Sequence, residues 1–431
     1  MGRWWAGIDW SWGLQDFVII DDGGRVVLHL RVEESREGVE QILRALRDLN
    51  PTSHRFSRRQ VPIAIEDGSR LLVAELQRRR QPVVVIPPAV TARYRGRHGA
   101  AVSKSDRGDA ALLADIIRQN PGRRSFLPEN SDQAAAIAVL ARTQASSTEA
   151  ARAIMLRLRS HLGLYFPAAV EAWSGMQYGL RRPEARAVLA LAPTPRLAAA
   201  LSKRRLHDTL AAAGRTRLLD EEAARLRELF AAPGLRQRPE TEQAMGERTR
   251  LHLAELSIAC QHAAHLSELA DTRFSAHPHH QIYRSFPACG PLVAARLFAE
   301  IGDAPERFPT GRHLRAYAGT APITWSSGSS HTVVHRTVCN RALKATVHQW
   351  AFGALTRSPG CRALYDARRE RGDGYAAALR HVGNRLLSGL HHCVRTDQLY
   401  QEHVMFPAVD GRDGVTGGQD EHLRVTLGRE P

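Results

Sequence analysis

The amino-acid sequence predicts an α/β domain followed by regions that are almost entirely α-helical. Over the first 125 residues, short β-rich runs alternate with amphipathic helical stretches. Beyond them, apolar residues recur at helical spacing, Ala, Leu, Arg and Glu dominate, and strand-like runs are nearly absent. The 431 residues and the 43% hydrophobic content are enough for about two or three packed domains.

The α/β domain is predicted element by element from turns, caps and periodicity. Asp21-Asp22-Gly23-Gly24 separates two β-rich runs, which is typical of a hairpin. Ser35 can cap a helix whose apolar residues share one face. The expected elements are strands at 4–10, 16–20 and 25–32, a helix at 36–49, a strand at 61–65, a helix at 70–79, a strand at 82–86, a loop at 87–105 and a helix at 106–119. This order matches a ribonuclease-H-like domain.

The remaining chain is predicted to hold a helical spacer, a second compact domain and a tail. Long helices, broken at prolines, are expected over 126–280 as an antiparallel bundle or coiled coil. Such helices are a natural association surface, so we expect a homo-oligomer, a dimer or a tetramer. The His-rich segment 276–280 is expected to be a linker to a mostly helical domain at 281–406. The Gly- and charge-rich residues 407–431 are expected to be a disordered tail.

Composition narrows the partners and the compartment. The 60 Lys and Arg residues against 44 Asp and Glu give a net charge of +16, which favours a polyanionic partner, nucleic acid before membrane. Five widely spaced cysteines without a C-x-x-C pair exclude a zinc ribbon and disfavour a disulfide framework. Because no apolar stretch is long enough to span a membrane, we expect a cytoplasmic, nucleoid-associated protein.

Four carboxylates stand at informative places in the α/β domain. Asp9 lies within the first strand, Glu66 ends the strand at 61–65, and Asp106 and Asp109 open the last helix on one face. Clustered carboxylates repel one another unless a cation neutralises them, and Mg²⁺ prefers oxygen ligands. The four together predict a Mg²⁺ site. Taken singly, Asp106 and Asp109 could instead satisfy a helix N-terminus, and Glu66 could belong to a turn.

Basic residues accompany these acids. Residues 78–107 carry eight Lys and Arg against one Asp, a local charge of +7. Beside a carboxylate cluster this predicts a patch that steers phosphates, although a solvated charged loop is the alternative. The candidate nucleic-acid-binding residues are Arg93, Arg95, Arg97, Lys104 and Arg107, and, in the second compact domain, Arg336, Arg341 and Lys344.

The second compact domain carries a serine-rich segment. It follows Tyr317-Ala318-Gly319 and includes Ser326, Ser327 and Gly328. From residue types alone, Ser327 can be either a nucleophile or part of a polar loop. Upstream, 286–295 resembles a helix–hairpin–helix in which Ala288 replaces the first glycine.

The order and spacing of these motifs resemble the DEDD transposases of the IS110 insertion-sequence family, relatives of the Piv invertases. The resemblance extends over all of the chain except the tail. The matching segments are Gly7-Ile8-Asp9, Ile65-Glu66, Lys104-Ser105-Asp106 with Asp109-Ala110, the helix with Arg152, Leu158 and Phe166-Pro167, Ile301-Gly302-Asp303, Tyr317-Ala318-Gly319 with Pro322, and Ser327-Gly328. Cys339 departs from the family pattern, which usually has Gly before the position of Asn340.

The resemblance implies a fold, a cofactor, a nucleophile and partners. It implies a RuvC-like N-terminal domain that holds Mg²⁺ through Asp9, Glu66, Asp106 and Asp109, and a helical C-terminal transposase domain. It assigns the nucleophile to Ser327, with Ser326 as the alternative register. It also implies that a structured noncoding bridge RNA, encoded by the element, pairs with donor and target DNA.

The sequence thus predicts an RNA-guided, Mg²⁺-dependent serine transposase of a mobile element. Two alternatives remain. One is a RuvC-like nuclease in which metal-bound water cleaves the phosphodiester and Ser327 is structural. The other is a non-catalytic nucleic-acid scaffold that retains the fold.

Overall fold

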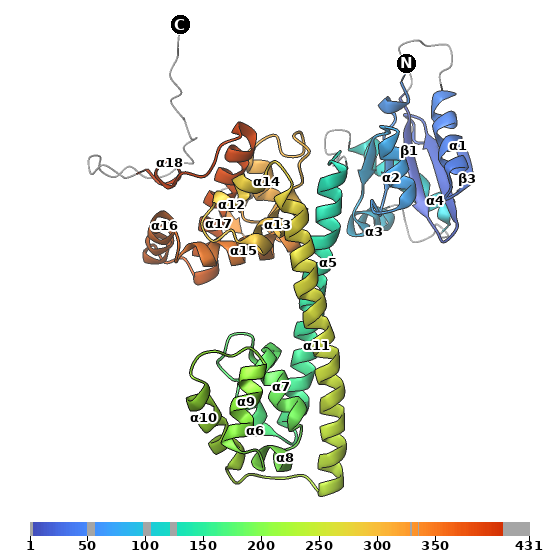
Figure 1. Cartoon of the computed structure of the whole chain (residues 1–431). Coiled ribbons are helices and arrows are strands. Elements are labelled where there is room, and N and C mark those ends of the chain that lie inside the picture. The colour runs from blue at the N-terminus through green and yellow to red at the C-terminus, as the bar shows by residue number, and fades with distance from the viewer. Residues whose placement is uncertain are drawn as a thin grey trace. The chain divides into compact units, whose positions relative to one another are not determined.

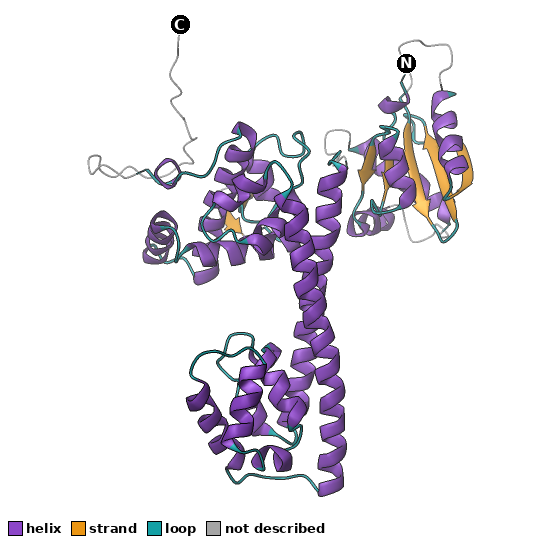
Figure 2. Ribbon diagram, in the orientation of Figure 1, coloured by secondary structure: helices purple, strands orange, loops and turns teal. Residues whose placement is uncertain are grey.

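The computed structural model describes residues 3–49, 57–97, 105–120, 127–327, 330–334 and 336–407. The chain divides into two compact units, Met1–Glu129 and Asn130–Pro431, here called the α/β unit and the helical unit. Figure 1 labels their elements and Figure 2 distinguishes strands from helices. Lys104, Gly328 and residues 408–431, which include almost all of the expected tail, lie outside the described residues.

A five-stranded sheet organises the α/β unit, as predicted (Figure 2). Its strands are β1 (Trp5–Trp10), β2 (Leu14–Ile20), β3 (Val26–Glu33), β4 (Ile63–Ile65) and β5 (Val83–Val85), in the order β3-β2-β1-β4-β5. β2 is antiparallel to both of its neighbours, β1 and β3, whereas β4 and β5 run parallel to β1. β1 therefore lies at the centre of the sheet, and its carboxyl end lies at the same edge as that of β4.

Helices cover both faces of this sheet. They are α1 (Arg36–Arg47), α2 (Leu71–Arg78), α3 (Pro88–Arg97) and α4 (Asp106–Gln119), with a short 3₁₀ helix, η1 (Arg58–Gln60). α1 and α2 pack on the face that carries Ile8 and Phe17. α4 packs on the other face, against Val18 and Ala64. The predicted cap is present, since Ser35 accepts a hydrogen bond from the N–H of Gly38, and the structure adds a second cap at Ser105, which accepts one from Gly108.

The predicted loop at 87–105 is wrong in its first part. Residues Pro88–Arg97 form α3, which begins with proline, the residue favoured at the first position of a helix. Val90 and Tyr94 pack against the α4 face of the sheet. The arginines of this segment are compatible with a helix, because arginine is a good helix former, and Val90 and Tyr94 supply apolar contacts that dock it.

Two long antiparallel helices, α5 (Asp132–Gly163) and α11 (Pro239–Ser275), dominate the helical unit (Figure 1). Their contacts run in opposite directions along the chain, because Gln144 bonds to Ala263 while His161 bonds to Met245. The helices between them are α6 (Pro167–Glu171), η2 (Gly179–Arg181), α7 (Pro183–Leu191), α8 (Pro195–Ala199), α9 (Lys203–Ala212) and α10 (Leu219–Ala231). Prolines were predicted to separate the helices. Pro167, Pro183 and Pro195 do so, and each is the first residue of the helix that follows.

The C-terminal part of the helical unit adds a helical core with one β-hairpin. Its elements are α12 (His280–Ser285), α13 (Pro291–Ile301), α14 (Gly311–Tyr317), β6 (Ile323–Ser327), β7 (Ser330–Val334), α15 (Arg341–Ala354), α16 (Pro359–Glu370), α17 (Tyr375–Thr396) and α18 (Glu402–Met405). Its core also includes Ile137 from α5 and Phe274 from α11. The opposite ends of the two long helices belong to a second core, formed with α6 to α10. The helix pair therefore joins two cores.

The expected linker at 276–280 is instead a packed turn. His277 is only 7% exposed and its ring packs against Phe274 and Phe298. Its Nε2 lies 3.3 Å from Oδ2 of Asp303. A run of histidines and one proline predicted a loop by composition, but aromatic imidazole rings can be buried when a carboxylate partners them. In the described ranges, no helix is both long and apolar enough to cross a membrane.

Candidate active site

Strand register brings two of the predicted carboxylates to one edge of the sheet. β1 and β4 are parallel, with Gly7 opposite Ala64. Asp9 and Glu66 each lie two residues further along their chains, so both emerge at the same carboxyl edge. Strand alternation places Asp9 on the same face as Trp5, which is the face covered by α4.

A close approach of α4 to β1 brings in the other two carboxylates. A Cβ atom at Gly7 would lie 2.1 Å from the carbonyl oxygen of Ala110, so only glycine permits this contact. Ala110 follows Asp109 directly, in the first turn of α4. Because the helix start is held against β1 here, Asp106 and Asp109 lie beside the end of that strand.

The four carboxylates line one cavity of about 420 Å³, here called the acidic cavity. Its other lining residues are Trp10, Pro88, Thr91, Ala92, Arg95 and Leu113. Burial raises the pKa of Asp9 from 3.8 to about 6, and the charges of Asp109, Asp106 and Glu66 add to the increase. The four predicted acids are therefore close enough for their charges to repel one another, and this repulsion disfavours the ionised form of Asp9.

The residues of the acidic cavity suit a hard cation. The oxygens of four carboxylates are the ligand type that Mg²⁺ prefers, and a divalent charge would offset the repulsion that raises the pKa of Asp9. Thr91 is 2% exposed, and its hydroxyl has no hydrogen-bond partner within the described residues. In those same residues, however, no three His, Cys, Asp or Glu side chains already form a metal-ligand set. The cavity thus has the right chemistry but requires side-chain movement to coordinate an ion.

One predicted phosphate-binding residue lies inside this cavity. The Nη2 atom of Arg95 is 2.7 Å from Oδ1 of Asp109. This ion pair, which the sequence did not predict, partly neutralises the cluster. Arg93 and Arg107 are exposed, on α3 and at the start of α4 respectively. Arg97 belongs to α3, but its side chain is not described, and Lys104 lies outside the described residues.

The candidate serines lie on a β-hairpin of the helical unit that the sequence did not predict. We call β6 and β7 the serine hairpin. Ser327 is the last residue of β6 and pairs with Ser330, while Ser326 pairs with His331. The side chains of these residues are outside the described set, so the hairpin defines the backbone position of each serine.

A partly buried hydrogen-bond network joins the two ends of the segment that carries the serine hairpin. Asn340, which follows the hairpin, donates from Nδ2 to Glu300 at 2.7 Å and to the hydroxyl of Tyr317, which precedes the hairpin, at 2.8 Å. The backbone N–H of Asn340 also donates to the carbonyl of Tyr317 at 2.8 Å. Glu300 is 6% exposed and accepts from Nε of Arg142 at 2.9 Å. We call Arg142, Glu300, Tyr317 and Asn340 the Glu300 network.

Two further contacts close the base of the hairpin segment. Gly319 has a positive φ of 71°, and a Cβ there would lie 2.6 Å from Sγ of Cys339. Asn340 also caps α15, since its Oδ1 accepts from the N–H of Leu343 at 2.8 Å. Cys339, which departs from the family pattern, thus fills the space beside Gly319. Glu300 was not predicted from the sequence. It is the one acid in the largely apolar helix α13, and this position could have indicated a buried polar contact.

The predicted basic residues of this domain lie around the start of α15. Arg341 is exposed at the first position of the helix, and Lys344 is partly buried near Gly319. Arg336 belongs to the segment that connects β7 to α15, and its side chain is partly buried. Upstream, Ala288 has a φ of 56°, the left-handed conformation that a glycine adopts at such a turn. The chain therefore makes the hairpin between α12 and α13 without the usual glycine.

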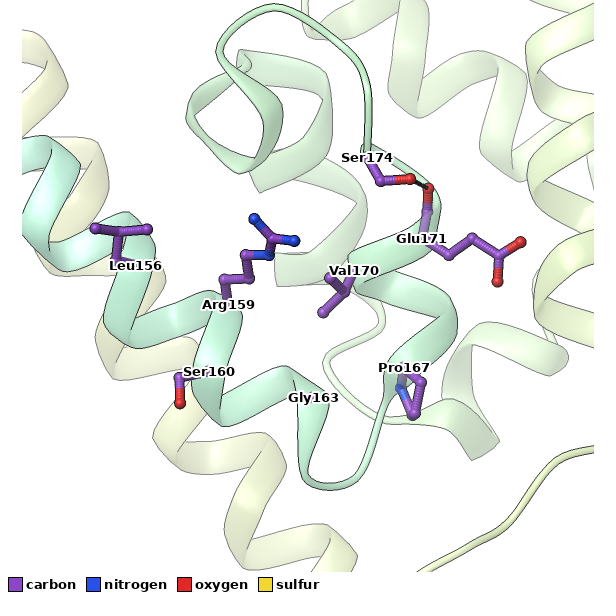
Figure 3. Close-up of a pocket in the computed structure, with 8 residues that line it drawn as sticks. All are labelled: Leu156, Arg159, Ser160, Gly163, Pro167, Val170, Glu171 and Ser174. Atoms are coloured by element: carbon purple, nitrogen blue, oxygen red, sulfur yellow. Dashed lines mark hydrogen bonds between the residues drawn. The ribbon is translucent and has the colours of Figure 1, made fainter.

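A larger hollow of about 630 Å³ lies on the helical unit, between the end of α5 and α6. Arg159 and Val170 extend toward each other across it, whereas the carboxylate of Glu171 points away (Figure 3). None of the predicted site residues lines this hollow. Lacking a converging acid or nucleophile, it offers no catalytic arrangement comparable to the acidic cavity.

Comparison with known proteins identifies the class. A transposase family matches residues 6–167, which include all four carboxylates, and the transposase family of IS116, IS110 and IS902 matches residues 280–366, which include the serine hairpin. The protein is a transposase. More particularly, the chain belongs to the IS110 family of insertion-sequence transposases.

Individual relatives agree with this assignment. The protein of the IS117 mini-circle of Streptomyces coelicolor, described as a candidate transposase, is 41% identical over 93% of this chain and 96% of its own length. A 43.6 kDa protein of IS110 from the same species is 35% identical over 30% of this chain and 32% of its own. A 42 kDa protein of IS900 from Mycobacterium paratuberculosis is 24% identical over 92% of this chain and 96% of its own length.

Proposed function

We propose that this transposase is a bridge-RNA-guided serine recombinase that cuts and rejoins DNA with the assistance of Mg²⁺. The observation that carries the proposal is the meeting of Asp9, Glu66, Asp106 and Asp109 in one cavity at the carboxyl edge of the sheet. The strand order β3-β2-β1-β4-β5 with flanking helices supports a RuvC-like assignment of residues 1–125. Residues 126–280 would form a coiled-coil spacer for oligomerisation and residues 281–406 the serine domain.

The four carboxylates are proposed to hold Mg²⁺. When bound, the ion supplies a Lewis acid that stabilises negative charge on the scissile phosphate. Arg95 competes for Asp109 through their ion pair, so its guanidinium is proposed to turn from Asp109 to a phosphate oxygen when the site is loaded. Arg93 and Arg107, exposed beside the cavity, would bind neighbouring phosphates.

Ser327 is proposed to supply the nucleophile. Its hydroxyl oxygen forms a bond to phosphorus while the bond from phosphorus to one deoxyribose oxygen breaks, and the serine proton passes to the leaving oxygen. The DNA end stays attached as a phosphoserine ester, so the energy of the phosphodiester is conserved. A hydroxyl of another DNA end then attacks the ester, restores the phosphodiester and returns the proton to Ser327. Arg336, Arg341 and Lys344 would hold the strand near the serine hairpin.

The remaining partners follow from the family resemblance and the charge. A structured noncoding RNA would choose donor and target DNA by base pairing, and the net charge of +16 suits a complex with both nucleic acids. The two long helices are proposed to associate between copies as a dimer or tetramer, in which Asp9 of one copy could serve Ser327 of another. The expected location is the cytoplasm, on the nucleoid.

Serine variants test the nucleophile. With purified protein, guide RNA and end-labelled donor DNA, wild type is expected to form a covalent protein–DNA adduct that survives denaturation. Ser327→Ala should abolish both adduct and recombination, whereas Ser326→Ala should retain them. The reverse result would move the nucleophile to Ser326. Cleavage without any adduct would instead indicate a RuvC-like nuclease that uses water, and binding without cleavage would indicate a scaffold.

Removal of the RNA tests the guide. Omitting the RNA of the element, or treating the complex with ribonuclease, should eliminate recombination at the specific site while leaving nonspecific DNA binding in place. Undiminished site-specific recombination without RNA would contradict the guided mechanism. Mass measurement of the complex in solution should give a dimer or tetramer, and a monomer with nucleic acid bound would contradict the oligomer.

A further inference from the structure

The tip of the β1–β2 hairpin carries a large aromatic side chain that stays almost fully exposed. Trp12 is 91% exposed, whereas burial of an indole usually stabilises a protein substantially. The turn itself is well defined: Ser11 bonds to the carbonyl of Leu14, and Gly13 has a φ of 93° that suits glycine. Trp12 is therefore held outward by a tight turn.

This turn adjoins the acidic cavity. Trp12 follows Asp9 by three residues, about 10 Å of extended chain. Its ring centroid lies 6.2 Å from that of Trp10, at an interplanar angle of 79°, and Trp10 lines the cavity. An exposed aromatic ring thus stands within the reach of a nucleotide that places its phosphate in the cavity.

A salt-bridged arginine stacks on Trp10, the other member of this aromatic pair. The guanidinium of Arg70 lies 3.3 Å from the ring centroid of Trp10, and its Nε is 2.9 Å from Oδ2 of Asp67. Asp67 directly follows Glu66, so the same chain segment holds both a cavity carboxylate and the support of Trp10. Trp10 thus contacts Arg70 on its face and Trp12 through a near-perpendicular ring contact.

We propose that Trp12 is a stacking platform for an unpaired nucleobase next to the phosphate that occupies the acidic cavity. Aromatic rings bind unpaired bases through their flat faces, independently of sequence, whereas bases within a duplex already stack on their neighbours. The inference rests on the proposed function, because it requires a nucleic-acid strand in the cavity. It adds a substrate preference: the strand is unpaired at the nucleotide beside the scissile phosphate.

Substitution of Trp12 tests the platform. The full-length protein is titrated with fluorescein-labelled single-stranded DNA, single-stranded RNA and duplex DNA, with Ca²⁺ in place of Mg²⁺. Trp12→Leu is expected to weaken single-strand binding about 5- to 150-fold, the loss of one stacked base, and to change duplex binding less than about twofold. Trp12→Phe should restore most of the affinity. Tyr178→Leu, which removes an exposed aromatic residue of the helical unit, is the matched control and should bind as wild type.

Intrinsic fluorescence gives a second measure. Binding of the single strand should quench the tryptophan emission of wild type more than that of Trp12→Phe, because the quenched indole is absent from the variant. The strand type, DNA or RNA, for which Trp12→Leu loses affinity identifies the source of the base. Wild-type single-strand binding by Trp12→Leu, or an equal loss for strand and duplex, would overturn the platform. Asp9→Asn with full recombination activity would instead overturn the proposed function itself.

Discussion

The acidic cavity of the α/β unit and the serine hairpin of the helical unit place their candidate reactive groups by different means. In the α/β unit, the register of two parallel strands and the close contact of α4 at Gly7 bring four carboxylates together. In the helical unit, the ends of the hairpin segment are joined by the Glu300 network. Main-chain packing therefore positions the acids, whereas side-chain hydrogen bonds fix the ends of the segment that carries the serines.

This difference predicts where substitutions act. Changes in the acidic cavity should impair chemistry with little loss of stability, because the cavity residues repel one another in the fold. Changes in the Glu300 network should destabilise the helical unit, because they leave polar groups that are buried or partly buried without partners. The following predictions separate the two effects, from the largest to the smallest.

The largest expected effect is the loss of activity in Asp106→Asn. Removing one carboxylate weakens the charge that holds the metal, and we expect recombination to fall at least about 100- to 1,000-fold. Quantification of recombined product in Mg²⁺ checks this. Asp115→Asn, on the same helix but outside the cavity, should retain activity. Full activity of Asp106→Asn would contradict the metal site.

Glu300→Ala should destabilise the helical unit by about 2 kcal/mol, because Arg142 and Asn340 each lose a hydrogen-bond partner. Denaturant unfolding measures the change. A double-mutant cycle with Arg142→Ala should give a coupling of about 1 kcal/mol. Independence of the two substitutions would show that Glu300 does not act through this network.

The pKa of Asp9 predicts a pH dependence of stability. Its value in the fold, about 6, lies above its ordinary value of 3.8, so the unfolded chain ionises first as the pH rises. Asp9 therefore adds no penalty below about pH 4 and a full penalty above pH 6. The shift corresponds to about 3 kcal/mol, which partial solvent exposure reduces to about 1 kcal/mol. Without metal, Asp9→Asn should exceed wild type in stability at pH 7.5 by this amount.

The advantage of Asp9→Asn should diminish as the pH falls toward 4.5. Thermal unfolding of both proteins across this range, in EDTA, measures the difference. Addition of Mg²⁺ at pH 7.5 should stabilise wild type more than the variant, since the ion neutralises the repulsion. An advantage that grows at low pH would contradict the sign of the shift.

The smallest expected effect is at Ala288, whose φ of 56° is unfavourable for any residue with a Cβ. Ala288→Gly should stabilise the protein by about 0.5 kcal/mol, the relief of strain less the entropy that glycine adds to the unfolded chain. Ala294→Gly, inside α13, should destabilise by about 1 kcal/mol. Destabilisation by both would show that Ala288 is not strained.

The two regions also differed in how far the sequence predicted them. The α4 bounds, the cap at Ser35 and the meeting of Asp9 with Glu66 followed from local patterns and strand order. Arg95 was expected to bind phosphate, yet it pairs with Asp109. This contact depends on α3, which was predicted from the sequence to be part of a loop. The serine hairpin and the burial of His277 depend on contacts distant in sequence, for which periodicity carries no signal.

The central claim is that the carboxylates of one unit and the serine of the other act in the same chemical step. The most direct measurement is the yield and position of the protein–DNA adduct, determined by protease digestion and mass spectrometry for wild type and Asp9→Asn. We predict that wild type carries the DNA on Ser327 and that Asp9→Asn forms no adduct. An adduct formed by Asp9→Asn at the wild-type rate, or DNA cleavage by wild type without an adduct, would contradict the claim.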